Sequence, residues 1–445
     1  MHKPCFQPIA ILSLLAFQGL TSAQPAAAPP KPATEPPKVV AGVPVNYDEA
    51  LVGTYSLPNP LILANGKPVR DAKTWTTQRR PEIVKLFEEN QYGKAPGRPK
   101  EMSFEVFDKA TPALDGKAIR RQVTVYFSAD KSGPKMDLLL YLPAAATKPV
   151  PVLLNLSFSA NSSVVDDPGI KPGEIWGRDK KRVPAAAGRN FGRINVKPFL
   201  DAGIGFATIY YGDIDPDFEG GVEFGVRKLY LKAGEKEPGP GEWGSIAAWA
   251  WGLSRAVDYF ETDKGVDAKR IAILGVSRLG KTVMWAGAND QRIGAVIASC
   301  SGEGGAAISR RDYGEKVKHL ALRYGYQFAK NYANFGDAVD QMPMDAHMLV
   351  ALVAPRPLLL QTGDKDFWSD PKGEFLAAVG AEPVFKLLGK TALGTDKMPP
   401  AGEEILHTLS YSMHAGGHGT IPSDYDLFLR FLKMQFLKDT SQLRD

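Results

Sequence analysis

Ser277 stands where an apolar run gives way to a stretch that can begin a helix. The segment IAILGVSRLGK, residues 271–281, starts like a buried strand and ends in Gly, Val, Ser, Arg, Leu, Gly and Lys. A serine on a strand-to-helix turn is placed to act as a nucleophile, usually within the pattern Gly-x-Ser-x-Gly. Here Leu279 occupies the position of the second glycine, and Gly280 follows one residue later. We predict that Ser277 is a nucleophile and that the backbone N–H of Arg278 forms half of an oxyanion hole.

A serine nucleophile needs a base, and His418 is the histidine best placed to supply it. Gly417 and Gly419 allow a loop to present its ring, and it follows the last strand-like run, as in the chain order Ser, acid, His. His414 is expected to have a structural role. The spacing of these two histidines could suggest zinc, but Ala-Gly-Gly between them argues against the helix that such a site needs, so we predict no metal. The other histidines lie at the N-terminus, before the penultimate strand or at the start of the last one: His2, His319, His347 and His407.

The third group of such a site is a carboxylate that orients the histidine and stabilises its charged form. Asp366, in LLLQTGDKDFWSDPKGEF, follows the penultimate strand-like run, which is the usual position for this acid. Glu303 follows the preceding run in the glycine-rich CSGEGG, a setting that equally suits a tight turn. Asp364 and Asp370 are expected to cap the nearby turn or helix. We favour Asp366, with Glu303 as the alternative acid.

The elements that must position these residues alternate between buried strands and helices. From residue 150 onward the apolar runs VPVLLNLSF, GIGFATIYY, RIAILGV, GAVIAS and RPLLLQTG occur, with helical stretches such as residues 244–262 between several of them. This order predicts a mainly parallel, doubly wound sheet in a three-layer α/β sandwich. Before it, residues 74–93 are predicted to be helical, and SFEVF, RQVTVYFS and MDLLLYLP to be antiparallel strands. The order is that of an α/β hydrolase, with Ser277 at the carboxyl end of a central strand, where such sheets bind ligands.

Several separated motifs, in order along the chain, resemble those of one family. GVSRLGK, residues 275–281, is similar to the G-x-S-R-x-G-K motif of the glucuronoyl esterases, carbohydrate esterase family 15, and the chain resembles the bacterial type. The resemblance includes RRPEIVKLFEENQYG, YYGDIDPD, SGEGGAAISRRDYGE, MPMDAHMLVALVAPRPLLL, DFWSDPKGEF and GGHGTIPSDYD. It implies an exported α/β hydrolase without a cofactor. Such an enzyme cleaves the ester between xylan-borne glucuronic acid, often 4-O-methylated, and lignin alcohols.

The resemblance also implies roles for residues around the nucleophile. Arg278 would stabilise the oxyanion through its side chain as well as its N–H, since a cation beside the developing charge adds electrostatic stabilisation. Lys281 matches a lysine that hydrogen-bonds a sugar hydroxyl in the family. Glu315 resembles the carboxylate that holds the sugar ring, and Trp368 resembles an aromatic residue beside the pyranose. Each has a simpler explanation: Lys281 as a solvated helix residue, Glu315 as a surface charge and Trp368 as core packing.

Cys300 departs from the family's pattern. Many members carry the catalytic Glu directly before the Ser-Gly-x-Gly-Gly turn, where this chain has Cys300. A thiol cannot orient an imidazolium as a carboxylate does, so we expect the acid's role to fall to Asp366, as the resemblance implies for other members of the bacterial type. The departure leaves two other hypotheses: an acetyl-xylan or other carbohydrate esterase on the same fold, and a non-catalytic carbohydrate-binding relative. Arg278 and Lys281 favour the glucuronoyl esterase.

Composition and the N-terminus indicate an exported protein with one catalytic domain. The chain has 445 residues and a formal net charge of +5, and no block of Lys and Arg of the kind that binds nucleic acid. Residues 1–23 are typical of a secretory signal peptide, with an apolar run too short to anchor the protein in a membrane. Residues 24–44, rich in Pro and Ala, are predicted to be a disordered linker, and residues 45–445 a single α/β-hydrolase domain. Removal of Cys5 would leave Cys300 without a disulfide partner. We expect a monomer, in the periplasm or outside the cell.

Overall fold

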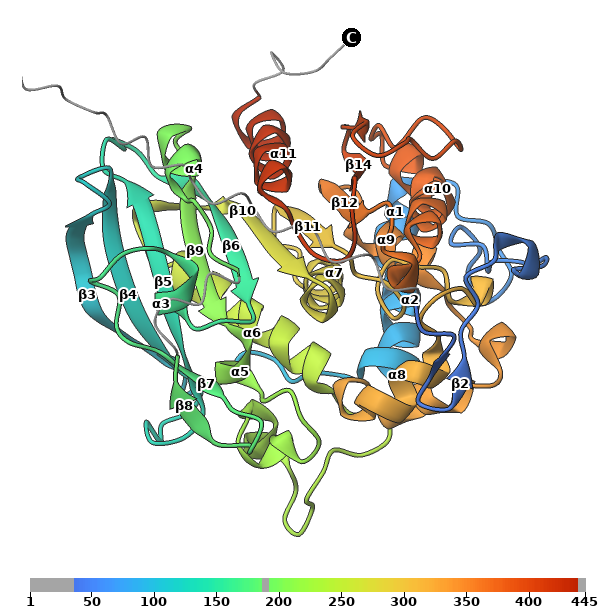
Figure 1. Cartoon of the computed structure of the whole chain (residues 1–445), viewed down its shortest axis with the longest axis horizontal. Coiled ribbons are helices and arrows are strands. Elements are labelled where there is room, and N and C mark those ends of the chain that lie inside the picture. The colour runs from blue at the N-terminus through green and yellow to red at the C-terminus, as the bar shows by residue number, and fades with distance from the viewer. Residues whose placement is uncertain (1–35, 186–191, 439–445) are drawn as a thin grey trace, which may run out of the picture. The chain divides into compact units, whose positions relative to one another are not determined.

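A ten-stranded sheet organises the part of the chain that the computed structural model describes, residues 36–185 and 192–438 (Figure 1). From Pro37 onward these residues belong to one compact unit. The strand order is β13-β14-β12-β11-β10-β6-β9-β5-β4-β3. The bounds of these strands are β3 (Ser103–Ala113), β4 (Ala118–Tyr126), β5 (Lys135–Pro143), β6 (Val150–Ser157), β9 (Gly205–Tyr210), β10 (Val266–Val276), β11 (Ala295–Ser299), β12 (Leu358–Gly363), β13 (Glu404–Ile405) and β14 (Leu409–His414).

Six neighbouring strands in the middle of the sheet run parallel: β9, β6, β10, β11, β12 and β14. Antiparallel strands flank them on both sides. Parallel pairs join β9 to β6, β6 to β10, β10 to β11, β11 to β12 and β12 to β14. On one side β5, β4 and β3 continue the sheet with antiparallel pairing, and on the other side β13 does so. Every residue of β6, β11 and β12 is buried, which is why these strands are continuous apolar runs in the sequence. The predicted sheet is confirmed.

Helices cover both faces of this sheet, so the fold has three layers. Along β10, Ile271 and Ile273 face one apolar core, and Ala272 and Leu274 face the other. The first core contains residues of α6, α7, α9 and α10, and the second contains residues of α4 and α11. The bounds of the helices are α1 (Ala72–Thr74), α2 (Arg80–Phe87), α3 (Asn161–Val164), α4 (Lys197–Asp201), α5 (Tyr211–Ile214), α6 (Ser245–Phe260), α7 (Arg278–Asn289), α8 (Val317–Tyr324), α9 (Ala346–Val353), α10 (Pro371–Leu387) and α11 (Pro422–Leu432).

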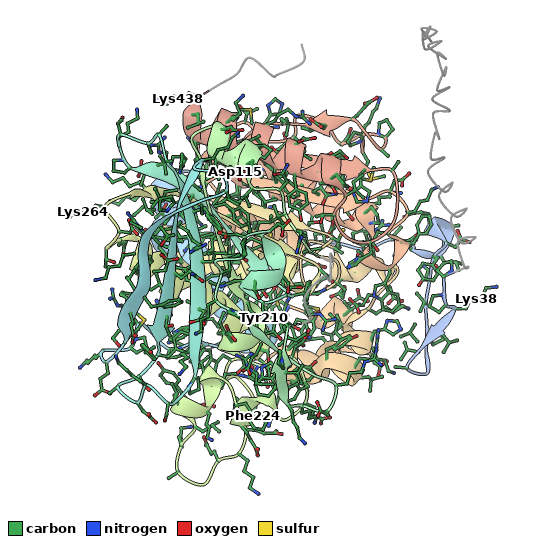
Figure 2. The ribbon with its side chains drawn as sticks, turned by 60° about the vertical axis from the view of Figure 1, so that its left-hand side comes forward. Lys38, Asp115, Tyr210, Phe224, Lys264 and Lys438 are labelled. Atoms are coloured by element: carbon green, nitrogen blue, oxygen red, sulfur yellow. The ribbon has the colours of Figure 1, made fainter. Side chains whose placement is uncertain are left out.

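The helical segment before the sheet also matches its prediction. Residues 72–92 are helical throughout, with one π-helical stretch before α2 and one after it. Ile83 and Phe87 lie on the same side of α2 and are completely or almost completely buried. Figure 2 shows how side chains fill the interior, where Tyr210 lies, whereas Lys38, Phe224 and Lys264 lie at the rim.

The predicted linker ends too late in the sequence. Residues 24–44 are predicted to be a disordered linker. Residues 24–35 lie outside the described residues, but β1 (Val39–Val40) pairs with β2 (Val43–Pro44) in an antiparallel hairpin. Both turn residues between these strands have positive φ, +51° and +77°, a geometry usually carried by Asn-Gly or Asp-Gly. The chain has Ala41 and Gly42 instead, so the sequence lacked the usual hairpin signal.

Three further points concern the N-terminal segment, a second hairpin and the length of the helices. The predicted signal peptide, residues 1–23, lies outside the described residues. A second small hairpin joins β7 (Glu174–Trp176) and β8 (Arg182–Pro184). Within the described ranges, none of the helices is both long enough and apolar enough to cross a bilayer.

Candidate active site

Ser277 lies between β10 and α7 on a sharply bent turn. Its φ is +61° and its ψ is −128°, a conformation that a residue with a side chain adopts only under strain. A Cβ on Gly275 would lie 2.2 Å from the Leu279 carbonyl oxygen, so only glycine fits before the turn. A Cβ on Gly280 would lie 2.7 Å from the Ser299 carbonyl oxygen, so the late glycine lets α7 approach the end of β11. The geometry is that of a strand-to-helix nucleophile turn.

The start of α7 provides hydrogen-bond donors beside Ser277. The backbone N–H of Lys281 donates to the Ser277 carbonyl at 3.1 Å and begins the helix. The N–H groups before it, including that of Arg278, have no acceptor within the helix. Such groups, together with the helix dipole, favour negative charge at this point. The turn can therefore stabilise an oxyanion that forms next to Ser277.

His418 and Asp366 contact each other on loops that follow neighbouring strands. Asp366 comes after β12 and His418 after β14, and Nδ1 of the imidazole lies 2.7 Å from Oδ2 of the carboxylate. Ser369 Oγ lies 3.2 Å from the same nitrogen. Asp366 is only 4% exposed, whereas the side chain of His418 is 43% exposed. Burial alone would raise the pKa of Asp366, but the hydrogen bond and charge of His418 bring it below its ordinary value. The carboxylate is thus ionised and oriented toward the imidazole.

Glu303, the alternative acid, is hydrogen-bonded to residues other than His418. Its Oε1 accepts hydrogen bonds from Ser309 Oγ at 2.6 Å and from the Tyr332 hydroxyl at 2.8 Å. Burial raises the pKa of Glu303 to about 8. The structure therefore brings Asp366, and not Glu303, against the imidazole.

His414 and the two other acids have local roles. Both ring nitrogens of His414 are engaged: Nδ1 lies 2.9 Å from Asp424 Oδ2, and Nε2 lies 3.1 Å from the Gly417 carbonyl oxygen. His414 is therefore structural, as expected. Asp364 accepts from the backbone N–H of Gly416, and Asp370 caps α10, as the sequence predicted.

Cys300 packs against the loop that carries His418. Its Sγ accepts a hydrogen bond from the Gly419 N–H at 3.3 Å and lies 3.5 Å from the carbonyl oxygen of the same residue. Ligand atoms of Cys300, Asp366 and His418 lie within 4.8 Å of one another. Burial, with help from nearby Asp366, raises the pKa of the thiol to about 12, so Cys300 is neutral. The neutral thiol contacts the histidine loop at Gly419 without supplying a negative charge there.

Two cavities meet at Ser277 and His418, which line both of them. The first, here called the polar cavity, has a volume of about 240 Å³. Besides Ser277, His418 and Asp366 it is lined by Arg278, Lys281, Glu315, Arg323, Gln327 and Trp368. The second, here called the apolar cavity, has a volume of about 750 Å³. Its lining includes Phe158, Ile194, Pro198, Phe199, Ile421 and Tyr425.

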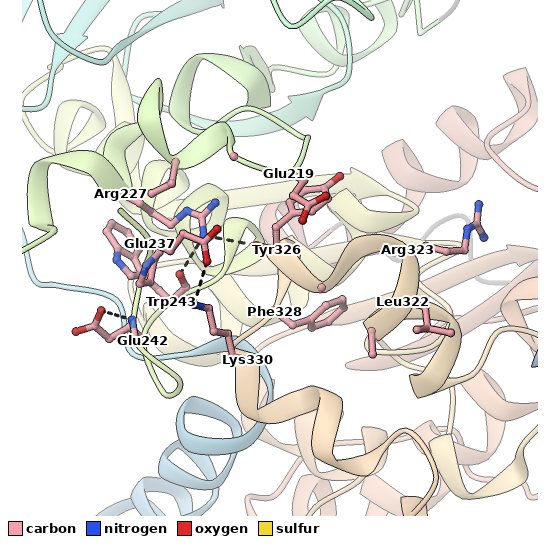
Figure 3. A pocket seen from close by; sticks show the side chains of 16 residues that line it. Glu219, Arg227, Glu237, Glu242, Trp243, Leu322, Arg323, Tyr326, Phe328 and Lys330 are labelled. Carbon is pink, nitrogen blue, oxygen red and sulfur yellow. Dashed lines mark hydrogen bonds and ion pairs between the residues drawn. The ribbon is translucent and has the colours of Figure 1, made fainter. Parts of the chain in front are cut away.

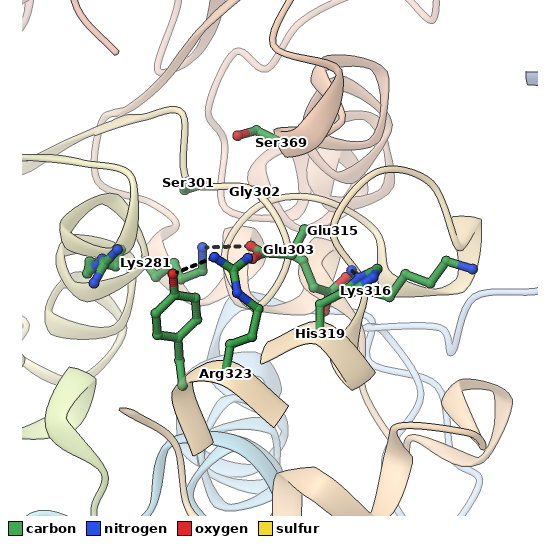
Figure 4. A network of polar contacts seen from close by, with 12 residues as sticks. Lys281, Ser301, Gly302, Glu303, Glu315, Lys316, His319, Arg323 and Ser369 are labelled. Carbon is green, nitrogen blue, oxygen red and sulfur yellow. Dashed lines mark hydrogen bonds and ion pairs between the residues drawn. The ribbon is translucent and has the colours of Figure 1, made fainter. Parts of the chain in front are cut away.

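Lys281 and Glu315 face each other in the polar cavity (Figure 4). Lys281 Nζ lies 3.8 Å from Glu315 Oε2, and the two side chains are 6% and 8% exposed. Burial lowers the pKa of Lys281, and the charge of Glu315 counteracts part of this shift. The simpler explanations, a solvated lysine and a surface glutamate, are therefore wrong. Trp368 is only partly buried and lines the same cavity, so it is not core packing either.

Other residues of the polar cavity were not singled out from the sequence. Ser369, beside the imidazole, belongs to the DFWSDPKGEF motif, which was noted only for its resemblance. Arg323 and Gln327 come from α8 and the turn after it. Figure 4 shows Arg323 next to the Lys281–Glu315 pair. No local pattern marked these two residues, because their position depends on how α8 packs.

Known proteins that are similar to this chain in sequence are described as esterases. The family model described as "Glucuronyl esterase, fungi" matches residues 239–389. Carbohydrate esterase MZ0003, from an unknown prokaryotic organism, is 43% identical over 394 residues, which cover 87% of this chain and 91% of that protein.

Solved structures that are similar to this chain are also described as esterases. A glucuronoyl esterase from Solibacter usitatus is 49% identical and superposes with a TM-score of 0.84, over 87% of this chain and 100% of its own. A promiscuous CE15 esterase from the marine bacterial metagenome is 41% identical, with a TM-score of 0.80, over 88% of this chain and 100% of its own. Similarity of this extent means that the chain belongs to carbohydrate esterase family 15, the glucuronoyl esterases, and is a carboxylic ester hydrolase.

Proposed function

We propose that the protein hydrolyses the ester between glucuronic acid of glucuronoxylan, often 4-O-methylated, and lignin alcohols. Ser277 is the nucleophile, His418 the base and Asp366 the acid of a Ser-His-Asp triad. The observation that carries this proposal is the 2.7 Å contact between Asp366 and His418, on a ring that lines the same cavities as Ser277. The relative from Solibacter usitatus, described as a glucuronoyl esterase, supports the substrate class.

The reaction proceeds through an acyl-enzyme. His418 takes the proton of Ser277 as Oγ attacks the ester carbonyl carbon, and Asp366 stabilises the imidazolium that results. The negative charge that develops on the carbonyl oxygen is stabilised by the N–H and side chain of Arg278. The intermediate collapses as His418 gives the proton to the departing alcohol. Water, activated by the same histidine, then attacks the acyl-enzyme and releases the free uronic acid and Ser277.

The sugar of the acid half fits the polar cavity. An esterified uronic acid carries no charge, so its hydroxyl groups are what the site must recognise. Lys281 donates and Glu315 accepts, and their pairing leaves further hydrogen-bonding capacity on both groups. Trp368 offers an aromatic face to the pyranose. Polar groups that already hold one another lose little freedom when the sugar binds.

The alcohol half fits the apolar cavity on the other side of Ser277. Its volume of about 750 Å³ suits a bulky alcohol, and rings such as Phe158, Phe199 and Tyr425 suit an aromatic one. This arrangement supports a lignin alcohol as the leaving group.

The export of the protein belongs to the same proposal. Residues 1–23 act as a signal peptide, and the mature protein is a single catalytic domain, monomeric, that meets its polymeric substrate in the periplasm or outside the cell. A substrate built into plant cell walls is reached only by an exported enzyme.

The promiscuous relative gives reason to test a second ester class, the acetyl esters of xylan. We expect the wild type to hydrolyse benzyl glucuronate with a higher kcat/KM than it shows in releasing acetate from acetylated xylan. Ser277→Ala should abolish both reactions, and a serine-reactive phosphonate should label Ser277. An enzyme that releases acetate but leaves benzyl glucuronate intact would contradict the substrate. Normal turnover by Ser277→Ala would contradict the mechanism.

A further inference from the structure

Asp217, in the segment that follows α5, accepts hydrogen bonds from four side chains. Its Oδ2 accepts from Arg278 Nη1 and from the Tyr211 hydroxyl, the latter at 3.1 Å. Its Oδ1 accepts from the Tyr326 hydroxyl at 2.9 Å and from the Gln327 amide at 2.6 Å. The side chain of Asp217 is 8% exposed. A carboxylate has about four acceptor positions, so groups of the protein itself occupy this one fully.

One of the four donors is the residue directly after the nucleophile. Among the residues that the structure describes, Asp217 is the one carboxylate that forms an ion pair with Arg278. The guanidinium carbon lies 5.0 Å from the centre of the Tyr324 ring and 6.0 Å from that of Phe158. These contacts fix the plane of the guanidinium and one of its nitrogens. Its other N–H groups remain for an acceptor in the polar cavity, which Arg278 lines.

The segment that carries Asp217 is itself held by a second acid, Asp215. Asp215 is completely buried, and Arg227 Nη2 donates to its Oδ2 at 2.8 Å. Arg227 Nη1 also reaches the Tyr326 carbonyl oxygen at 3.5 Å (Figure 3). Arg227 thus joins the two segments whose side chains meet at Asp217. Asp215 fixes the scaffold, whereas Asp217 contacts Arg278, which lines the polar cavity.

We propose that Asp217 is a positioning residue, which holds the Arg278 guanidinium where the oxyanion forms when Ser277 attacks. The inference rests on the proposed function, in which Arg278 stabilises that charge. An arginine that is fixed before the substrate binds has no side-chain freedom left to lose in the transition state. Charged groups held in this way stabilise a transition state more than groups that must reorganise.

The proposal predicts that Asp217 and Arg278 act as a unit. We would measure kcat and KM on benzyl glucuronate for Asp217→Asn, Arg278→Ala and the double variant. We expect Asp217→Asn to lower kcat by ~10–100-fold, less than the ~100–1000-fold typical of removing an oxyanion donor, with KM changed by less than about 3-fold. In the Arg278→Ala background the same substitution should change kcat by less than about 2-fold, since residues that act as a unit give non-additive losses.

Two outcomes would overturn the proposal: an unchanged kcat in Asp217→Asn, or equal losses in the two backgrounds. Asp217→Glu keeps the carboxylate and should recover part of the lost kcat. The matched control is Asp213→Asn, four residues earlier in α5, where the carboxylate pairs with Arg182 outside both cavities. We expect its kcat to stay within about 2-fold of the wild type. A loss in this control as large as that in Asp217→Asn would indicate general disruption of the segment and overturn the proposal.

The failure of this inference can be told apart from that of the proposed function. An inert wild type on benzyl glucuronate contradicts the function. The same single and double variants are then measured on p-nitrophenyl acetate, whose hydrolysis also forms an oxyanion at Ser277. Non-additive losses on that ester would support the role of Asp217, and additive losses would overturn it.

Discussion

The two cavities that meet at Ser277 differ in how their walls are held. In the polar cavity the charged groups of the wall are already paired, Lys281 with Glu315 and Arg278 with Asp217, which is not itself part of the lining. The apolar cavity is about three times as large, 750 Å³ against 240 Å³, and rings and aliphatic side chains dominate its wall. A wall of paired charges imposes directions on its ligand, whereas an apolar wall mainly imposes a volume. The acid half of the ester should therefore be selected strictly and the alcohol half loosely.

Among the side chains expected to contact the two halves of the substrate, the largest effect is expected at Lys281. Lys281→Met should lower kcat/KM for benzyl glucuronate by ~10–100-fold, because a hydrogen bond from a charged group to the sugar is lost. Hydrolysis of p-nitrophenyl acetate, which has no sugar, should change by less than about 3-fold. The same substitution at the more exposed Lys318, which pairs with Asp337, is the control and should leave both reactions unaltered. Equal losses on both esters would indicate that Lys281 supports the fold and not the sugar.

A smaller effect is expected at Trp368. Trp368→Ala should raise KM for benzyl glucuronate by ~3–10-fold, in line with the energy of an aromatic contact. Phe367, the preceding residue, is 42% exposed and lies outside the polar cavity, so Phe367→Ala is a matched control. Kinetics of the two variants side by side would check this. A higher KM in Phe367→Ala than in Trp368→Ala would refute the sugar contact.

In the apolar cavity the expected effect is smaller still and depends on the alcohol. Ile421 is 37% exposed and lines this cavity. Ile421→Ala should raise KM for the benzyl ester by ~2–4-fold, through the loss of apolar contact area, and leave the methyl ester unchanged. Leu51→Ala, at a residue 73% exposed and outside both cavities, is the control. An equally large rise in KM for the methyl ester would indicate that the alcohol does not bind in the apolar cavity.

The smallest effect on turnover is expected at Glu303, which should alter stability instead. The ordinary pKa of a glutamate is 4.5, and burial raises that of Glu303 to about 8. Between these values the folded protein holds a proton that the unfolded chain has released, so stability falls as the pH rises through this window. Glu303→Gln should match the wild type near pH 5 and melt a few degrees higher (about 2–4 °C) near pH 9. Melting curves of both proteins at both pH values check this. An equal difference in melting temperature at the two pH values would contradict the raised pKa of Glu303.

Much of the fold followed from patterns within single segments. The buried strands β6, β10, β11 and β12 are apolar runs, and the glycines at 275 and 280 mark the turn at Ser277 in the amino-acid sequence itself. The hairpin at residues 39–44 was missed, because its turn is Ala-Gly and its neighbours are rich in proline. A sequence pattern predicts a strand, helix or turn well only where the residues of that same segment determine its conformation.

The candidate site was less predictable, because its contacts join distant segments. Asp366 and Glu303 both follow a parallel strand, and only packing turns Glu303 toward Ser309 and Tyr332. Likewise, the partners of Asp217 lie up to 110 residues away along the chain, so no spacing pointed to them. Resemblance to the family named Lys281 and Glu315, but their burial against each other is a property of the folded chain.

The most direct test of the account compares two acids on one substrate. We would measure kcat for benzyl glucuronate with the wild type, Asp366→Asn and Glu303→Gln, after confirming by circular dichroism that all three are folded. We predict that Asp366→Asn loses ~10⁴-fold in kcat, as expected when the imidazole loses its orienting carboxylate. Glu303→Gln should stay within about 3-fold of the wild type. A collapse in Glu303→Gln with Asp366→Asn still active would contradict the assignment of the acid and, with it, the triad proposed here.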